Sequence, residues 1–477
     1  MAPHTTLQAP ATRKLAGYEF YREVLGSPKY VVAPMVDQSE LAWRILSRRL
    51  GAQLIYTPMI NAKMFSSPSS TRYRLSAFNL PNTEEGHPSL DRPLIVQFAA
   101  NDPAQLLASA RLVEDRCDAV DINLGCPQDI AKRGRYGAFL QDDWELIYQM
   151  INTLHTNLKI PVTAKFRIFP SIEKTVQYAQ MLERAGAQIL TCHGRVREQR
   201  GQNTGLASYA HIAAVKRAVR VPVLANGNIL FHADIERCLA ETGADGVMCA
   251  EGQLYNAALF VGEGSSPLST ILSHSPSTPA PTPIPAMHAL STAAHPPHTT
   301  LAQTYLSIVL HPTLKTKPPL SAVKGHMFKL LRPALGRPGM EDLRERTGRV
   351  GVGGGGGRSR GEGGGDGMWW AREFLDIVWE VEKRMEADAS AALPAGHTIQ
   401  TLTATDPATG LDILPHWLAQ PYFRVAKEKK EVVEVEAEVL VVGEKDKGVT
   451  RSPLVLDGIK RAMVAHEARE PESVLVA

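Results

Sequence analysis

Cysteine is scarce in this chain of 477 residues, which contains five in all. No two of them are close enough in sequence to form a CxxC pair, since they lie at Cys117, Cys126, Cys192, Cys238 and Cys249. Zinc sites and small disulfide scaffolds depend on regular spacings, and an odd number of cysteines fits free thiols in a reducing compartment. The sequence therefore argues against a disulfide framework and against a bound metal.

Neither sign of charge is in large excess, because 52 lysine and arginine residues face 49 aspartate and glutamate residues and give a net charge of +3. So small a surplus does not by itself indicate nucleic-acid binding, and any basic surface must be local. No apolar run approaches the roughly 18 residues of a membrane helix. We expect a soluble intracellular monomer, cytoplasmic or nuclear, that makes no membrane contact.

The N-terminal segment 1–14 lacks the apolar core of a secretory signal. It contains threonines and basic residues, and no acidic residue occurs before Glu19. A mitochondrial targeting segment therefore stays open as an alternative.

Short apolar runs alternate with amphipathic stretches between Tyr30 and Glu251. Repeated βα units of this kind are typical of a parallel sheet. The predicted strands are 30–35, 53–56, 94–98, 119–123, 162–166, 189–193, 223–226 and 246–249. The predicted helices between them are 39–49, 103–115, 143–156, 172–185, 208–218 and 233–242. Eight strands with helices between them predict an α/β fold, a TIM (β/α)8 barrel.

Composition changes sharply after the predicted barrel. Residues 261–300 are rich in proline, serine, threonine and histidine, and residues 351–367 are mostly glycine. Helical spacing of apolar residues returns at 301–310, 320–335 and 369–385. We predict a flexible N-terminus at 1–27, a barrel at 28–260, a disordered insertion at 261–300, a smaller helical domain at 301–385 interrupted by the loop 351–367, and a mostly disordered tail at 386–477.

Polar residues and glycines stand at the carboxyl ends of nearly all the predicted strands, where TIM barrels carry their chemistry. They include Gln97, Asn123, Lys165, His193 and Asn226. Each alone has an ordinary explanation, such as a loop cap, a surface lysine or a packed core histidine. Together, at equivalent positions of successive strands, they indicate a site.

Glycine-bearing loops after the last two strands, at 226–228 and 251–253, are typical of a phosphate site in such a barrel. Lys165 on the fifth strand would place a positive charge beside a planar ring over the barrel mouth. These features favour FMN, whose reduced form is anionic. No GxGxxG follows the first strand, which argues against a dinucleotide-binding Rossmann fold.

Cys126 lies in a loop bent by Gly125 and Pro127, directly after the fourth strand. A thiol with a pKa near 8.5 is mostly protonated at neutral pH and can donate a proton to carbon. Free cysteines are more often structural, and the other four fall in or beside predicted helices and strands. The charged segment 132–137 that follows is either a solvated loop or a rim that contacts phosphates, with Lys132 and Arg133 as candidates.

A second basic feature lies on the predicted helix 320–335. Lys324, His326, Lys329 and Arg332 are spaced so that they share a broad helix face. That face is either an ordinary solvated surface or a grip on the phosphates of an RNA.

Several segments together resemble the tRNA-dihydrouridine synthase family. They are NLGCPQ at 123–128, KRGRYGAFL at 132–140, KFR at 165–167, HGRVREQRG at 193–201 and ANGNI at 225–229, with APM at 33–35 and QFA at 97–99. The resemblance covers roughly 28–260 and resumes at 301–385. There the segment 320–335 resembles the helical domain of the eukaryotic branch that modifies D-loop uridines 16 and 17.

The resemblance implies reduction of the uracil 5,6 double bond in tRNA, with FMN as cofactor and NADPH or NADH as reductant. Hydride would pass to C6, and Cys126 would protonate C5. The implied FMN positions are Pro34, Met35, Gln97, Lys165, His193, Asn226, Gly227, Asn228, Ala250, Glu251 and Gly252, while Asn123 and Arg195 would position the uracil or the flavin. The implied RNA grip is the basic face Lys324, Lys329 and Arg332. Asn228 stands where many members have Asp, and Glu251 stands where many have a Gly-Arg phosphate contact.

Three alternatives remain open on the sequence. An FMN barrel that reduces a small pyrimidine explains the strand ends but not the basic helical addition. A catalytically silent tRNA-binding relative explains the basic addition without chemistry at Cys126. Within the family, the branch that acts on uridine 20 is the third alternative.

Overall fold

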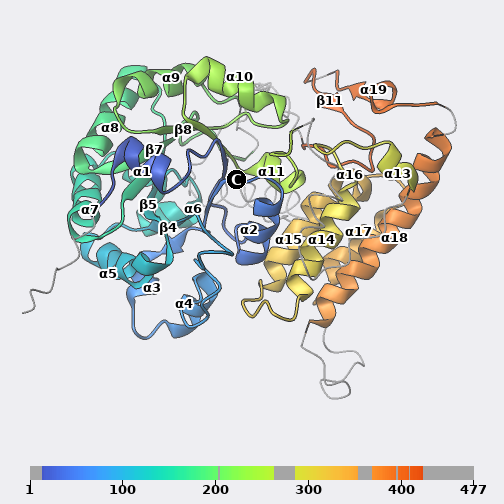
Figure 1. Ribbon diagram of the computed structural model, residues 1–477, viewed down its shortest axis with the longest axis horizontal. Coiled ribbons are helices and arrows are strands. Elements are labelled where there is room, and N and C mark those ends of the chain that lie inside the picture. Colours follow the sequence, from blue (N-terminus) through green and yellow to red (C-terminus); the bar gives the residue numbers. More distant parts are fainter. Residues whose placement is uncertain are drawn as a thin grey trace, which may run out of the picture. The chain divides into compact units, whose positions relative to one another are not determined.

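The computed structural model of the protein describes residues 13–201, 205–262, 285–352, 368–393, 396–407 and 409–422. Its central element is a parallel sheet surrounded by helices (Figure 1). The strands of this sheet follow the order β2-β1-β9-β8-β7-β6-β5-β4-β3. Pairing of β2 with β4 closes this sheet into a barrel of eight strands, and β3 adds to the carboxyl end of β4. The predicted TIM barrel is therefore confirmed.

The strands lie close to their predicted positions. They are β1 (Tyr30–Val32), β2 (Leu54–Tyr56), β3 (Ile60–Asn61), β4 (Leu94–Ala99), β5 (Ala119–Leu124), β6 (Val162–Arg167), β7 (Ala187–His193), β8 (Val223–Asn226) and β9 (Gly246–Cys249). Every residue of β4 and β5 is buried, including the polar ones, as expected for strands covered on both faces. Only β3 has no counterpart in the prediction.

Six helices on the outside of the barrel correspond to the predicted ones. They are α2 (Leu41–Arg49), α5 (Pro103–Val113), α7 (Trp144–Asn157), α8 (Ile172–Ala185), α9 (Tyr209–Ala218) and α10 (Ala233–Thr242). Residues that favour helix ends lie at the ends of two of these helices. The Asp102 carboxylate accepts the backbone N–H of Gln105 at the start of α5, and Gly186 in the left-handed region ends α8.

Shorter elements lie in the connections between strands and helices. They are α3 (Ala62–Ser66) and α4 (Thr71–Ala77) before β4, the 3-10 turn η1 (Glu114–Arg116) between α5 and β5, α6 (Asp129–Gly134) and the 3-10 turn η2 (Gly137–Leu140) after β5, and α11 (Glu251–Tyr255) after β9. The two segments after β5 contain the charged stretch that follows Cys126.

Helix α1 (Gly17–Glu23) contradicts the prediction of a flexible N-terminus. Phe20 is fully buried and Tyr21 is 4% exposed, and both belong to a cluster with side chains of β1, β2, β7, β8 and β9. The Tyr21 hydroxyl also donates to the carbonyls of Pro28 and Asp245. This helix therefore packs onto the barrel strands, and an aromatic pair in a segment without long periodicity gave too short a pattern to predict it.

The helical region begins earlier and ends later than predicted. Its elements are α13 (Pro285–Ala289), α14 (His298–Leu310), α15 (Leu320–Leu330), α16 (Arg332–Leu335), α17 (Glu341–Arg349), α18 (Trp369–Ala392) and α19 (Ile399–Leu402), followed by the hairpin β10 (Ala404–Thr405) and β11 (Asp412–Ile413). Helix α13 lies within the stretch 261–300 that was expected to be disordered, and α14 begins in it. The end of α18, together with buried Trp417 and Leu418, lies in the expected tail. Residues 1–12, 263–284, 353–367 and 423–477, on which the other disorder predictions fall, lie outside the described residues.

Helix α2 connects the barrel to the helical region through a buried polar group. The Glu40 carboxylate accepts the Tyr305 hydroxyl at 2.6 Å and contacts Nε2 of His326 at 3.0 Å. The His326 ring stacks on Trp43 with centroids 3.9 Å apart, and Trp43 Nε1 donates to Oε1 of Gln253. His326 is thus a packing residue and not part of an open basic face.

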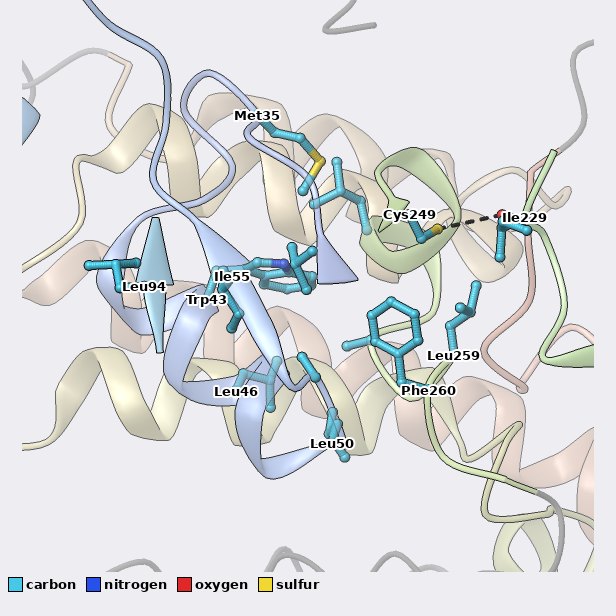
Figure 2. Close-up of a cluster of buried hydrophobic side chains, with 14 of the residues drawn as sticks. Met35, Trp43, Leu46, Leu50, Ile55, Leu94, Ile229, Cys249, Leu259 and Phe260 are labelled. Atoms are coloured by element: carbon cyan, nitrogen blue, oxygen red, sulfur yellow. Dashed lines mark hydrogen bonds between the residues drawn. The ribbon is translucent and has the colours of Figure 1, made fainter. Parts of the chain in front are cut away.

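Figure 2 shows the apolar side chains of α2 gathered with those of the loop that follows α11. Trp43, Leu46 and Leu50 lie toward Phe260 and Leu259, and all five belong to one buried cluster. The Cys249 thiol sits at the edge of this cluster and donates to the Ile229 carbonyl at 3.5 Å. Within the described ranges, no helix is long and apolar enough to cross a lipid bilayer.

Candidate active site at the barrel mouth

Strand register brings the predicted site residues together at one end of the barrel. Gln97 pairs with Asp121 and Asn123 pairs with Lys165. His193 pairs with both Arg167 and Asn226. Because all these strands are parallel, their carboxyl ends form one rim, and the site predicted from scattered residues is contiguous.

A chain of side-chain hydrogen bonds runs across the floor of this mouth. The Asp121 carboxylate accepts the Thr163 hydroxyl at 2.6 Å and the Gln97 amide at 2.8 Å. Gln97 Oε1 accepts the Asn123 amide at 2.8 Å. Since an ionised carboxylate can only accept, it fixes which end of the Gln97 amide faces it, and that in turn fixes the amide of Asn123.

Asp121 is a residue that the sequence reasoning missed. It is fully buried, and burial raises the pKa of its carboxyl to about 7, against the opposing effects of the Thr163 and Gln97 hydrogen bonds and of nearby Lys165. The signal was present, because an acid two residues before Asn123 on an otherwise apolar strand points to the same face. Perturbed carboxyls of this kind cluster at functional sites.

The loop that carries Cys126 is held from the strand side by Asn123. Its Oδ1 accepts the backbone N–H groups of Gly125 at 3.1 Å and Cys126 at 2.9 Å. Arg167, another residue not predicted for the site, donates from Nε to the Gly125 carbonyl at 2.8 Å. The thiol therefore sits in a loop whose backbone is fixed by two side chains.

The same loop is held from the other side by the turn η2. The Ala138 N–H donates to the Cys126 carbonyl at 3.0 Å. Gly137 has φ +66°, and a Cβ there would lie 2.7 Å from the Cys126 carbonyl oxygen. Only glycine satisfies both the left-handed backbone and this close approach. The segment 133–137, whose sequence is RGRYG, thus packs against Cys126 through Gly137.

Cys126 is half-buried, whereas the other four cysteines are buried. Burial raises the pKa of the Cys126 thiol above its usual value, against the opposing effects of a backbone hydrogen bond and of the charges of Arg167 and Lys165. The group is therefore protonated at neutral pH and reachable from the mouth. These are the two properties that a proton donor needs.

Lys165 supplies the positive charge predicted for the mouth. Burial lowers the pKa of its ammonium to about 8, with a further lowering from nearby Arg167. In the part of the chain that the structure describes, no carboxylate lies within ion-pair distance of this ammonium. An unpaired, half-buried ammonium of this kind suits an anionic ligand group.

His193 and Arg195 form a contact pair beside Lys165. Arg195 Nη1 lies 3.1 Å from His193 Nε2, and because a guanidinium can only donate, the imidazole nitrogen accepts. Burial lowers the pKa of His193 well below its usual value, and the neighbouring cations Arg167, Lys165 and Arg195 add to the effect. His193 is therefore neutral at physiological pH.

Asn228 holds a loop, although it was predicted to hold FMN. Its Oδ1 accepts Nη2 of Arg195 at 3.1 Å and the Ala207 N–H at 2.8 Å, and its Nδ2 donates to the Ala207 carbonyl. Its backbone is left-handed with φ +60°, a conformation that asparagine tolerates. Asn228 and Arg195 therefore hydrogen-bond to each other, and both also bond to the segment that contains Gly205 and Ala207.

Two glycines let the loops after β8 and β9 approach their neighbours closely. Gly227 has φ +123°, and a Cβ there would lie 2.6 Å from the Ala207 Cβ. A Cβ at Gly252 would lie 2.4 Å from the Ile229 carbonyl oxygen. Asn226 is buried and donates to the Met248 carbonyl, which joins the two strand ends. Glycines that let the backbone approach closely are typical of phosphate-binding loops in such barrels, so the residues present fit FMN.

The remaining FMN positions lie along the same rim. Met35 is buried and its N–H donates to the Ser39 hydroxyl, while Pro34 is half-buried beside it. Ala250 and Glu251 are also half-buried, at the start of α11. The carboxylate of Glu251 lies where a phosphate contact was expected, and its negative charge opposes one there.

The residues predicted to grip RNA do not form one surface. Lys132 and Arg133 are exposed on α6, immediately after the Cys126 loop. Lys324 donates to the Gly348 carbonyl, and Lys329 donates to Oε1 of Gln38 in the barrel. Arg332, at the start of α16, is exposed. The predicted basic face is thus partly used for internal contacts.

Fold and site define a (β/α)8 barrel with glycine-bearing loops after β8 and β9, an unpaired lysine and a half-buried thiol at its mouth. The family model described as "Dihydrouridine synthase (Dus)" matches residues 31–282. With relatives at 39–49% identity over most of the chain, this match shows that the chain belongs to the dihydrouridine synthase family.

The relatives share different lengths of the chain. A tRNA-dihydrouridine(16/17) synthase (NAD(P)+)-like protein of Rattus norvegicus is 49% identical over 71% of this chain and 67% of its own length. The Saccharomyces cerevisiae tRNA-dihydrouridine(16/17) synthase is 42% identical over 86% of this chain and 87% of its own. A Homo sapiens tRNA-dihydrouridine(20a/20b) synthase-like protein is 40% identical over 50% of this chain and 73% of its own.

Proposed function

We propose that this chain reduces uridine to dihydrouridine in the D-loop of tRNA, at positions 16 and 17, with NADPH or NADH as the reductant. The observation that carries the proposal is the half-buried, protonated Cys126 thiol at the mouth of a barrel that also presents Lys165 and glycine-bearing loops after β8 and β9. When bound, FMN supplies the hydride that adds to C6 of the uracil.

Cys126 donates the proton that C5 of the uracil receives. Its thiol is protonated because burial raises its pKa, and its loop is fixed by Asn123 and Arg167. Because the backbone of the loop is fixed, the thiol is already positioned when the uracil binds, which favours proton transfer. The uracil must leave its stack to come within reach of this thiol.

The cofactor is held by groups already fixed by the barrel. Lys165 places its unpaired charge at the mouth, where it would stabilise negative charge on a bound flavin. The phosphate would lie at the loops of Gly227 and Gly252, where the absence of side chains leaves the backbone open to close approach. Gln97 and Asn123 are oriented by Asp121, so the polar floor of the mouth is set before any ligand arrives.

The choice of uridines rests on the relatives. Those named for positions 16 and 17 match 71–90% of this chain, more than the barrel alone can account for, whereas those named for 20a and 20b match about half. Extended similarity in the region outside the barrel favours 16 and 17, because that region grips the RNA body and sets which uridine reaches the mouth.

The proposal is tested on the purified full-length protein. The expected result is a yellow protein whose flavin absorption is bleached by NADPH and recovers anaerobically when unmodified tRNA is added. Free uridine or dihydroorotate as the acceptor tests the small-pyrimidine alternative. Recovery of the absorption with these and not with tRNA would overturn the proposal, as would a colourless protein that binds tRNA and cannot be reconstituted with FMN.

A further inference from the structure

A cavity of about 490 Å³ lies away from Cys126, between α16, the end of α11 and the C-terminal segment 402–422. That volume is within the range of ligand sites. Arginines, tyrosines and a histidine line it together with apolar side chains, among them Arg332, Arg337, Tyr255, Tyr422, His416 and Leu414. The mechanism at the barrel mouth uses none of these residues.

Two guanidinium groups bring positive charge to this cavity with little to neutralise it. Arg332 lies over the Tyr422 ring, 3.5 Å from its centroid, and within the described ranges it has no carboxylate at ion-pair distance. Arg337 reaches Asp388 only at 4.0 Å, and that carboxylate is 3.0 Å from His416. The Arg337 side chain lines the cavity and is 48% exposed, so its charge is accessible to solvent.

The rest of the wall suits a planar ring. Tyr255 and Tyr422 lie with centroids 5.5 Å apart, and apolar side chains of the C-terminal segment complete the lining. Aromatic faces of this kind stack on nucleic-acid bases, and arginine forks match phosphate oxygens. One acidic group is present, since Asp406 lines the cavity and its Oδ1 caps the turn at Thr409. A carboxylate there accepts a hydrogen bond from a ribose hydroxyl, which a nucleotide of RNA provides.

The cavity lies close to the barrel mouth in the fold. Tyr255 is the last residue of α11, the five-residue helix that begins at Glu251 directly after β9. Such a helix spans only about 7 Å, so this wall adjoins the rim of the barrel mouth. The exposed rim lets a polymer enter and leave, as an RNA strand must on both sides of a bound nucleotide.

We propose that this cavity binds one nucleotide of the tRNA, with its phosphate on Arg332 and Arg337 and its base against the tyrosines. The inference rests on the proposed function. It assigns a role to the segment 402–422, which fixes Tyr422 and His416 beside the helical region. It also explains why Arg332 remains exposed while Lys324 and Lys329 are used for internal contacts.

Equilibrium binding of unmodified tRNA to the full-length protein tests this directly, without any turnover. We expect Arg332→Ala together with Arg337→Ala to weaken binding on the order of tenfold or more and to reduce the salt slope by about one per lost phosphate contact. Tyr422→Leu should weaken binding at an unchanged salt slope, and Tyr422→Phe should bind like the unaltered protein. Arg349→Ala is the matched control, because this exposed arginine pairs with Glu345 on α17, outside the cavity.

Two controls keep the outcomes distinct. Melting temperature and flavin content show whether each variant folds. Arg332→Lys keeps the positive charge but loses the planar guanidinium, so it separates bidentate phosphate binding from general electrostatic attraction. Unchanged tRNA affinity in the double arginine variant would overturn the inference. So would a raised KM for NADPH with an unchanged KM for tRNA, because the cavity would then hold the reductant. Failure of the proposed function would appear instead as loss of turnover in the unaltered protein.

Discussion

The Gln97 side chain donates a 2.8 Å hydrogen bond to the buried carboxylate of Asp121, beneath the mouth of the barrel. Through Asn123 this bond is connected to the backbone of Cys126. A carboxylate on the floor of the site therefore determines how the loop of the proton donor is held. The interior of the barrel contributes orientation as well as packing.

Two replacements of Asp121 separate the effect of its side-chain volume from the effect of its hydrogen bonds. Asp121→Leu removes the acceptor for Gln97, and an unpaired buried amide costs about 1–3 kcal/mol, so the amide can turn and release Asn123. Asp121→Asn keeps an acceptor toward Gln97, because the Thr163 hydroxyl can accept in place of donating. We expect kcat for tRNA reduction to fall about tenfold or more in Asp121→Leu and only a few-fold in Asp121→Asn. Equal losses in both would contradict this relation.

Stability should depend on pH through the same carboxyl. The folded pKa of Asp121 is about 7, above the value of about 3.9 in an unfolded chain, so the folded state holds the proton more tightly. The contribution of this group is most favourable below pH 4 and is lost as the pH rises through 7. We expect the unfolding free energy of the unaltered protein, relative to Asp121→Asn, to decrease between pH 4 and 7 in denaturant titrations. A difference that stays constant across this window would exclude the shift.

Gly137 should be essential for the position of the thiol. Gly137→Ala places a Cβ 2.7 Å from the Cys126 carbonyl oxygen, so the loop must move. Gly339→Ala is the control, because its φ of +82° is equally left-handed while nothing lies within 4 Å of the added carbon. Both variants carry a backbone cost of about 1 kcal/mol. We expect only Gly137→Ala to slow tRNA reduction and to alter the rate at which Cys126 is alkylated.

Lys165 should be needed for tight binding of the cofactor. Lys165→Met keeps the length of the side chain and removes the charge that faces the mouth. We expect the dissociation constant for FMN, measured by quenching of flavin fluorescence, to rise about tenfold or more. Lys324→Met, which removes a lysine that contacts the Gly348 carbonyl, should leave the constant unchanged. If both variants bind FMN like the unaltered protein, Lys165 does not contact the flavin.

The barrel could be predicted because its signals are local. Strands such as β5 are short and apolar, and Asp102 and Gly186 mark helix ends by their own chemistry. The site followed from the same regularity, since equivalent strand ends must meet at one rim. Tertiary contacts decided what could not be predicted. Lys329 and His326 lie on α15, directly before exposed Arg332. They contact Gln38 and Glu40 of the barrel, which are far away in the sequence.

The roles of Asp121 and Arg167 were missed for a related reason. Arg167 stood inside a recognised segment and Asp121 two residues before another, but their importance depends on which partner each side chain reaches, Gln97 for Asp121 and the Gly125 carbonyl for Arg167. Asn228 shows the converse. Its place in the ANGNI segment predicted a cofactor contact, which stays a prediction, whereas its contacts with Arg195 and Ala207 could not be foreseen from the sequence.

The most direct measurement follows the fate of the proton donor. Protein carrying Cys126→Ala is reduced with NADPH under anaerobic conditions, mixed with unmodified tRNA, and monitored by flavin absorption and by dihydrouridine content at positions 16 and 17. Cys238→Ala, which alters a buried thiol on α10, serves as the control. We predict that reduction by NADPH persists in both, while reoxidation by tRNA falls by about 10²–10⁴-fold in Cys126→Ala alone, the range for loss of a general acid. Dihydrouridine formed at the control rate by Cys126→Ala would contradict the assignment of this thiol.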